Sequence, residues 1–261
     1  AYHILAASSE EKLKQNMGDF WDTGKIDSDQ SIHIVYQGKK LTSRQRVYWK
    51  VMVWDKDGNP SNWSEISFWE MGLLNKQDWQ AKWIGSPDES DTFSNAPWFR
   101  KEFSLNKQIK TARAYISGLG YYELHINGKK VGDHVLSPNQ TNYDRRKDEK
   151  FAESRIGNMQ TRVLYETFDI TDFLTSGQNA LGVWLGAGWY RQNDRLTDVT
   201  LQYDSPRFIA QFEIEYTDGE KVVVCSDKSW KTSTSPILHN GLHTGEIYDA
   251  RLEQDGWDKS N

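Results

Sequence analysis

The sequence predicts an all-β fold made of two β-sandwiches. Apolar and polar residues alternate with period two along most of its 261 residues, and helical periodicity is nearly absent. Turn-forming dipeptides such as Asn-Gly and Asp-Gly separate the apolar runs. The 12 Trp, 12 Tyr and 10 Phe residues fit the same prediction, because aromatic side chains commonly fill the cores of sandwiches.

Residues 1–74 are predicted to form a small sandwich of the immunoglobulin or fibronectin type III kind. A strand is expected over residues 46–54, turn signals follow at 57–60, and residues 64–72 form the returning strand. The alternation in the first of these strands places four apolar side chains on one face: Val47, Trp49, Val51 and Val53. Because residues 1–8 already have the pattern of a strand, an earlier strand of this module is expected to be missing.

One helical turn is expected in the first module, within residues 8–18. Ser8 and Glu11 have the spacing of a capping box, in which each side chain satisfies a free backbone N–H. Gly18 is predicted to end the helix.

Residues 75–261 are predicted to form a second, larger sandwich. The boundary lies in the polar stretch 72–97, which contains Pro and Gly and has little periodic pattern. Strands are then expected at 98–105, 110–119, 121–128, 129–136, 161–171, 179–186, 207–219, 220–227 and 229–236. Asn127-Gly128 predicts a type I′ hairpin turn, and Asp218-Gly219 a second tight hairpin.

Composition and charge exclude several classes of function. With 32 Lys and Arg against 37 Asp and Glu, the net charge is −5, which argues against a nucleic-acid partner. No apolar run approaches the length of a membrane span, and the first residues lack the pattern of a signal peptide. The protein is therefore expected in the cytoplasm, or in the periplasm or outside the cell if a leader has been removed. Cys225, the only cysteine, is predicted to be a small buried hydrophobe.

Two glycine-rich stretches, 118–123 (GLGYYE) and 186–191 (GAGWYR), resemble phosphate-binding loops only superficially. A dinucleotide loop needs a third glycine and a following helix, and neither stretch has the third glycine or a helical pattern after it. We therefore expect these glycines to permit sharp bends and close backbone approach at the edges of the sandwich.

Other candidate chemistry is weaker. His239 and His243 are four residues apart but flank a turn, so the metal geometry of a helix is not expected. No nucleophile elbow occurs, and no catalytic residue is assigned. Residues 244–253 place acidic side chains and Arg251 around Tyr248. A buried network of arginine and carboxylates at a domain junction is favoured there over catalytic carboxylates.

The end of the strand at 181–186 is the candidate binding site. Two glycines are followed by aromatic and polar side chains that a sugar subsite combines, namely Trp189, Tyr190, Arg191, Asn193 and Asp194. In the alternative interpretation, Trp189 packs into the core or against a further domain.

Several motifs, in order and along nearly the whole chain, resemble the N-terminal region of bacterial family 78 glycoside hydrolases, the α-L-rhamnosidases. Residues 21–65 resemble their fibronectin-like module. Six later segments resemble the jelly-roll module that follows it in this family: AKWIG (81–85), WFRKEFSL (98–105), 115–138, RVLYETFDIT (162–171), NALGVWLGAGWY (179–190) and GEIYDARLE (245–253). One departure is the stretch 142–161, which is longer than the family pattern.

The resemblance implies a function for the longer protein. Members of this family hydrolyse terminal α-L-rhamnosides with inversion, using two carboxylates on an (α/α)6 barrel C-terminal to these modules. Residues 1–261 are then a non-catalytic N-terminal fragment whose partners are a rhamnose-containing glycan and the missing catalytic domain. In some relatives the jelly-roll module binds rhamnose through calcium, which makes calcium the expected cofactor, although no ligand is matched to a position here. The fragment is either an accessory carbohydrate-binding region or a scaffold for the barrel.

Overall fold

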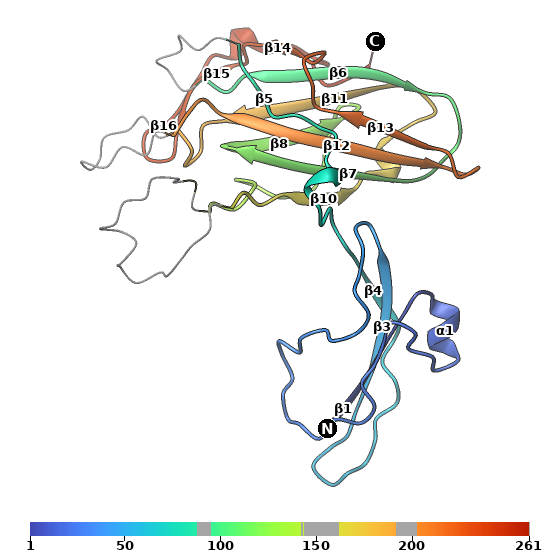
Figure 1. Ribbon diagram of the computed structural model, residues 1–261. Coiled ribbons are helices and arrows are strands. Elements are labelled where there is room, and N and C mark those ends of the chain that lie inside the picture. Colours follow the sequence, from blue (N-terminus) through green and yellow to red (C-terminus); the bar gives the residue numbers. More distant parts are fainter. Residues whose placement is uncertain (88–94, 142, 144–161, 192–202, 261) are drawn as a thin grey trace. The chain divides into compact units, whose positions relative to one another are not determined.

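A computed structural model describes residues 1–87, 95–141, 143, 162–191 and 203–260. Almost all of its regular elements are strands in antiparallel sheets, so the predicted all-β class is confirmed (Figure 1). The chain divides into two compact units, Ala1–Trp79 and Gln80–Asn261. In the described residues, no helix is long and apolar enough to cross a membrane.

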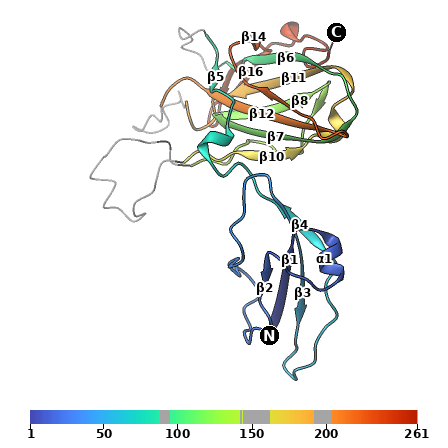
Figure 2. The ribbon, with the colours of Figure 1, turned by 45° about the vertical axis from the view of Figure 1, so that its right-hand side comes forward.

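The first unit contains one four-stranded sheet, in the order β2-β1-β3-β4 (Figure 2). Its strands are β1 (Tyr2–Ala7), β2 (Trp21–Asp22), β3 (Arg46–Val53) and β4 (Ser67–Glu70). Arg46 pairs with Glu70 and Trp49 with Ser67, so the predicted strand and its antiparallel return are confirmed. Leu5 and Ala7 of β1 form a small core with Leu13 on one face of this sheet.

The helix of the first unit, α1 (Glu10–Lys14), begins one residue later than predicted. Its N-cap is Ser9, whose hydroxyl accepts a hydrogen bond from the Lys12 amide, so the assignment of Ser8 as the cap was wrong. Ser8 instead donates from its amide and hydroxyl to Asp19, at 2.8 and 2.9 Å. The helix ends at Lys14, before Gly18. A Cβ at Gly18 would lie 2.3 Å from the Trp21 carbonyl oxygen, so this glycine permits a close approach rather than ending the helix.

The second unit is a sandwich of two five-stranded sheets (Figure 1). One has the order β10-β7-β12-β13, with β5 beside β12, and the other the order β14-β6-β11-β8-β9. The first sheet comprises β5 (Ile84–Gly85), β7 (Ile109–Leu119), β10 (Glu166–Asp169), β12 (Arg207–Tyr216) and β13 (Lys221–Cys225). The second comprises β6 (Trp98–Leu105), β8 (Tyr121–Ile126), β9 (Lys129–Lys130), β11 (Gly177–Gly186) and β14 (Lys231–Ser233).

Both sheets contribute to one apolar core. Phe99 of β6 and Leu181 of β11 come from one sheet, and Phe208 and Phe212 of β12 come from the other. The larger sandwich predicted from the alternation is therefore present, and its jelly-roll connectivity stays a prediction. A separate two-stranded sheet is formed by β15 (Ile237–Gly241) and β16 (Gly245–Tyr248). Short 3-10 turns occur at η1 (Lys76–Asp78), η2 (Thr171–Phe173) and η3 (Ala250–Leu252).

Both predicted hairpins of the second unit are confirmed. Asn127 and Gly128 have φ of 51° and 82°, as a type I′ turn between β8 and β9 requires. Gly219, with φ of 87°, lies in the turn between β12 and β13. The strand predicted over 129–136 is much shorter, because Gly132 at φ 73° turns the chain out of the ladder after Lys130.

Cys225 is only half-buried, in contrast to the prediction. It lies on β13, which is an edge strand of its sheet and is therefore incompletely covered. Burial raises the pKa of its thiol.

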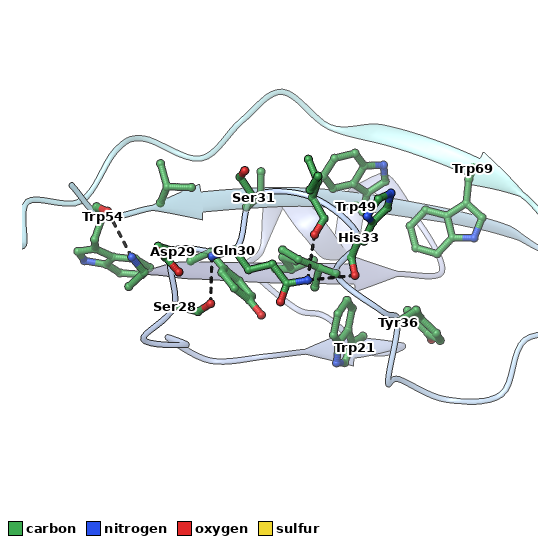
Figure 3. Close-up of a pocket in the computed structure, with 17 residues that line it drawn as sticks. Trp21, Ser28, Asp29, Gln30, Ser31, His33, Tyr36, Trp49, Trp54 and Trp69 are labelled. Atoms are coloured by element: carbon green, nitrogen blue, oxygen red, sulfur yellow. Dashed lines mark hydrogen bonds between the residues drawn. The ribbon is translucent and has the colours of Figure 1, made fainter. Parts of the chain in front are cut away.

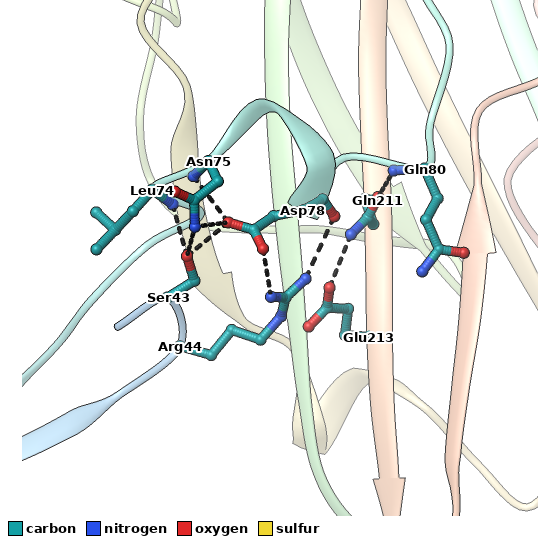
Figure 4. Close-up of polar contacts among 8 residues, drawn as sticks. All are labelled: Ser43, Arg44, Leu74, Asn75, Asp78, Gln80, Gln211 and Glu213. Atoms are coloured by element: carbon teal, nitrogen blue, oxygen red, sulfur yellow. Dashed lines mark hydrogen bonds and ion pairs between the residues drawn. The ribbon is translucent and has the colours of Figure 1, made fainter. Parts of the chain in front are cut away.

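Hydrogen bonds hold the chain in place in each unit, close to the boundary between Trp79 and Gln80 (Figure 4). Within the first unit, the Asp78 carboxylate accepts hydrogen bonds from the Ser43 hydroxyl at 2.5 Å and the Asn75 amide at 2.8 Å. These bonds hold the pKa of Asp78 at about 2. Within the second unit, the buried Gln211 accepts from the Gln80 amide at 2.7 Å through its side-chain oxygen.

Candidate functional site

Trp189 lies just beyond the end of β11, in a tight turn. The Ala187 amide donates to the Asn240 side-chain oxygen on β15 at 2.7 Å, which ties the end of the strand to the two-stranded sheet. Gly188 has a φ of 52°, in the left-handed region that favours glycine. The Arg191 amide then donates to the Ala187 carbonyl at 3.2 Å and closes the turn. Trp189 and Tyr190 are therefore presented by a rigid turn rather than by a strand.

The two glycine-rich stretches of the sequence lie against each other at this site. A Cβ at Gly120, where φ is 120°, would lie 2.2 Å from the Gly186 carbonyl oxygen. A Cβ at Gly188 would lie 3.0 Å from the ring of Tyr121. The interpretation that these glycines permit close backbone approach is therefore confirmed. The stretch that contains Gly120 leads into strand β8, not into the helix that a phosphate loop needs.

Trp189 is half-buried and held by two neighbours. Its ring lies edge-on to the imidazole of His243, with 5.6 Å between the ring centroids. Its other neighbour is Tyr121: burial raises the pKa of that tyrosine, and the nearby Trp189 side chain acts to lower it. The indole is therefore oriented by its neighbours while part of it remains accessible to solvent.

Tyr190, by contrast, is buried in a cluster of tyrosines. Its ring stacks on Tyr203 with centroids 5.6 Å apart, and Tyr143 meets it edge-on at 5.5 Å. Tyr143 also packs edge-on against Tyr203. Such aromatic contacts are each worth about 0.5–1.5 kcal/mol beyond burial, so this cluster stiffens the base of the Trp189 turn.

The polar candidates are only partly described. The Arg191 guanidinium donates to the Ser205 hydroxyl at 3.4 Å. Asn193 and Asp194 lie outside the described residues. Near the turn, the structure adds side chains that the sequence did not single out for binding: Tyr121, Tyr143, Tyr203, Asn240 and His243.

One sequence signal could have indicated Tyr121, since it directly follows Gly120 within the first glycine-rich stretch, 118–123. Asn240 and the tyrosines approach the turn only through tertiary structure, because no local pattern links them to residues 186–191.

The pair His239 and His243 does not converge. The His239 imidazole bonds the Thr244 hydroxyl at 2.9 Å, whereas His243 faces Trp189. Among the described residues, no group of three or more His, Cys, Asp or Glu side chains is arranged to hold a metal ion. The calcium that the family resemblance implies stays a prediction, because calcium also takes backbone and amide carbonyl oxygens as ligands.

Arg251, Glu246 and Glu253 are exposed and Asp249 is only partly buried, so the prediction of a buried network was wrong. Arg251 pairs with Asp249 at 2.6 Å while 88% of its side chain is exposed. The reason is that β16 belongs to the small two-stranded sheet, and all four of its residues are exposed. Hydrogen bonds from Arg251 hold the pKa of Asp249 at about 2, which makes it unsuitable as a general acid near neutral pH.

Comparison with known proteins places this architecture in a family. Residues 1–75 match the family described as "Rha78A-like, N-terminal immunoglobulin domain". Two overlapping segments, 107–153 and 148–261, match the "Alpha-L-rhamnosidase N-terminal domain".

Three relatives show the extent of the similarity. An α-L-rhamnosidase of Formosa agariphila is 40% identical over 288 residues, which cover 100% of this chain and 28% of that protein. An α-L-rhamnosidase from Alteromonas sp. is 35% identical, and the similarity extends over 98% of this chain and 27% of that protein. The structure of α-L-rhamnosidase from Dictyoglumus thermophilum superposes with a TM-score of 0.82 at 40% identity, covering 100% of this chain and 28% of that one.

The chain thus spans less than a third of the length of these relatives. The two family matches together cover residues 1–75 and 107–261, and the similarity to the first relative extends over the whole chain. The chain belongs to the α-L-rhamnosidase family and corresponds to the N-terminal region of its members.

Proposed function

We propose that residues 1–261 are the non-catalytic N-terminal part of an α-L-rhamnosidase and that the Trp189 turn binds a rhamnose-containing glycan. The observation that carries the proposal is the state of Trp189, which is half-buried, oriented by His243 and Tyr121, and still accessible. A pre-oriented indole can stack on the C–H face of a sugar without a large loss of side-chain entropy.

Polar groups stand beside this ring, as a sugar subsite requires. The His243 imidazole is in contact with the indole, and Arg191 lies two residues further along the chain. Sugar sites combine one apolar surface with a few hydrogen-bonding groups that set the orientation of the hydroxyls. Asn193 and Asp194 follow in the sequence and belong to the same proposed subsite.

A scaffold for the catalytic domain is the second candidate function. It is favoured by the buried tyrosine cluster of Tyr143, Tyr190 and Tyr203, which makes this end of the sandwich rigid. In this alternative, Trp189 is covered by a further domain of the longer protein and binds no sugar.

Replacing Trp189 with alanine separates the two functions. If the ring is a sugar platform, Trp189→Ala loses about 1–2 kcal/mol of stacking, which weakens rhamnose binding about 5- to 30-fold with little change in Tm. Titration calorimetry with L-rhamnose, with and without calcium, measures the binding. Trp54→Ala, which changes a half-buried tryptophan of the first unit, is the matched control and should leave binding unchanged.

The opposite outcome is equally clear. A parent chain that binds no rhamnose in either condition overturns the binding proposal. If Trp189→Ala then also costs about 3 kcal/mol of stability, as the loss of a packed tryptophan does, the scaffold function is supported.

A further inference from the structure

The second face of the sheet in the first unit opens into an aromatic pocket of about 580 Å³ (Figure 3). Its floor is built from alternate residues of two strands, including Ile4 of β1 and Trp49, Val51 and Val53 of β3. The predicted alternation of β3 is thus confirmed for the three residues that line the pocket. Trp69 lies toward one end and Trp54 toward the other.

The floor has the dimensions of a strand. Trp49 and Val53 are four positions apart, and a strand rises about 3.3 Å per residue, so the apolar row is about 13 Å long. An extended segment of four or five residues fits that length. Its alternate side chains would meet the row of β3 side chains as in the interior of a sandwich.

The cover of the pocket is a single irregular loop, residues 28–36. The Gln30 side-chain amide donates to the carbonyls of Ile32 and His33, so these bonds hold the loop to itself rather than to the sheet. Ile32 is 68% exposed and Val35 72% exposed. Apolar side chains of this size, exposed beside an apolar floor, indicate a surface that another element covers.

The opposite face of the same sheet is closed. Leu13 of α1 lies against Leu5 and Ala7, and Trp63 and Ile66 pack around them. An immunoglobulin-type sandwich has a second sheet packed about 10 Å from the first. All of residues 1–79 are described, and together they form one sheet and not two. The second sheet that an immunoglobulin-type sandwich requires is therefore missing from the aromatic face of this unit, although residues 1–75 match an immunoglobulin family.

We propose that the aromatic face is the inner face of this sandwich and that an extended apolar segment of the longer polypeptide, outside residues 1–261, packs on it as a strand. The chain spans only 28% of a relative that matches all of it, so such polypeptide is available in proteins of this family. The partner is thus a β-strand with large apolar side chains at alternate positions.

The lining favours a strand over a sugar. The floor of Ile4, Val51 and Val53 carries no polar group to hold hydroxyls. The polar lining side chains come largely from the loop, and the donors of Gln30 are already used by loop carbonyls. Sugar hydroxyls buried here would lose their bonds to water without replacement.

Cysteine accessibility tests this proposal. Two proteins are prepared: residues 1–261 and the longer protein encoded by the same gene. Each carries Val51→Cys together with Cys225→Ser, which removes the only native thiol of residues 1–261. The rate of labelling with a maleimide is then measured in each. Lys56→Cys, at an exposed turn of the same unit, is the matched control. We expect the thiol introduced by Val51→Cys to be labelled at least 100-fold more slowly in the longer protein, and the control rate to be equal in both.

A photoreactive residue at position 51 of the longer protein identifies the occupant. The expected cross-link, located by mass spectrometry, joins position 51 to an alternating apolar segment outside residues 1–261. Fast labelling in both proteins, slow labelling in both, or a cross-link to residues 1–261 or to a second copy overturns the proposal. If Val51→Cys impairs folding, Ile4→Cys on the neighbouring strand serves for the same measurement, since it lines the same floor.

Discussion

Glu123 on β8 lies between the side chains of Lys130 and His125. Its carboxylate is 2.6 Å from the Lys130 ammonium and 3.7 Å from the Nε2 atom of His125, whose Nδ1 atom contacts Asp258 at 2.8 Å. His125 and Lys130 hold the pKa of Glu123 at about 2, although its burial acts to raise the pKa. The ionised carboxylate is thus favoured by the folded state.

Glu123 therefore makes stability depend on acid pH. Because its folded pKa is below the ordinary value of 4.5, its contribution is full above about pH 4.5 and is lost as the pH falls toward 2. We expect Glu123→Gln to reduce the free energy of unfolding at pH 7 by at most about 1 kcal/mol, since 42% of the side chain is exposed and solvent screens the pair. Near pH 2 the variant and the parent should be equal.

Urea unfolding at both pH values measures this difference. Asp133→Asn, which changes a fully exposed carboxylate, is the control and should show no such pH dependence. A loss for Glu123→Gln that is the same at pH 2 and pH 7 would mean that packing, and not charge, is responsible.

At the scale of elements, residues 254–259 pack against the sheet that contains β6, β8 and β11. We call residues 254–259 the C-terminal strap. Trp257 stacks on Trp98 of β6, with centroids 4.8 Å apart and planes 7° from parallel. The Gly128 amide donates to the Asp258 carbonyl at 3.0 Å, and the Arg100 guanidinium donates to the Lys259 carbonyl at 2.6 Å. Ring stacking and backbone bonds thus act together.

The strap depends on a glycine in the middle of β11. A Cβ at Gly182 would lie 2.7 Å from the Trp257 ring, closer than real Cβ contacts allow. We expect Gly182→Ala to displace Trp257 and to cost about 1–3 kcal/mol of stability, the usual range for overpacking. In a Trp257→Ala background the closest contacts are gone and only the Asp258 Cβ at 3.1 Å remains, so the same change should cost less.

A double-mutant cycle from chemical denaturation measures this coupling. Near-UV circular dichroism reports the loss of the Trp98–Trp257 stack in each single variant. Equal costs for Gly182→Ala in both backgrounds would show that the tryptophan does not set the requirement for glycine.

At the scale of the whole molecule, residues 1–261 are two β units that match the N-terminal region of much longer hydrolases. Inverting hydrolysis of a glycoside needs an acid and a base about 6.5–9.5 Å apart on either side of the scissile bond. The family resemblance assigns these carboxylates to a C-terminal barrel. The chain is accordingly proposed to support or assist the reaction rather than to perform it.

We therefore expect purified residues 1–261 to release no nitrophenol from 4-nitrophenyl α-L-rhamnopyranoside. The longer protein from the same gene is the positive control in the same spectrophotometric assay. Turnover by residues 1–261 that disappears when an Asp or Glu within them is replaced would place catalysis in this region and contradict the proposal.

Much of the fold could be predicted because its signals are local. Alternation along residues 46–53 depends only on neighbouring side chains, and it predicted both the strand β3 and the face that lines the pocket. The turn at Asn127-Gly128 was predictable for the same reason, since these residue types accept a positive φ. The linked motifs along the chain likewise predicted the family that the comparisons show.

The candidate site was predictable only in part. The sequence by itself determined that glycines, aromatic residues and polar residues meet at the end of β11. Only the tertiary structure decided that Trp189 stays half-exposed while its neighbour Tyr190 is buried. It also decided that Arg251 is exposed and that Gly182 lies beneath Trp257. The physical reason is that burial depends on partners distant in the chain, such as Asn240 beside Ala187, and no local pattern of residues encodes such contacts.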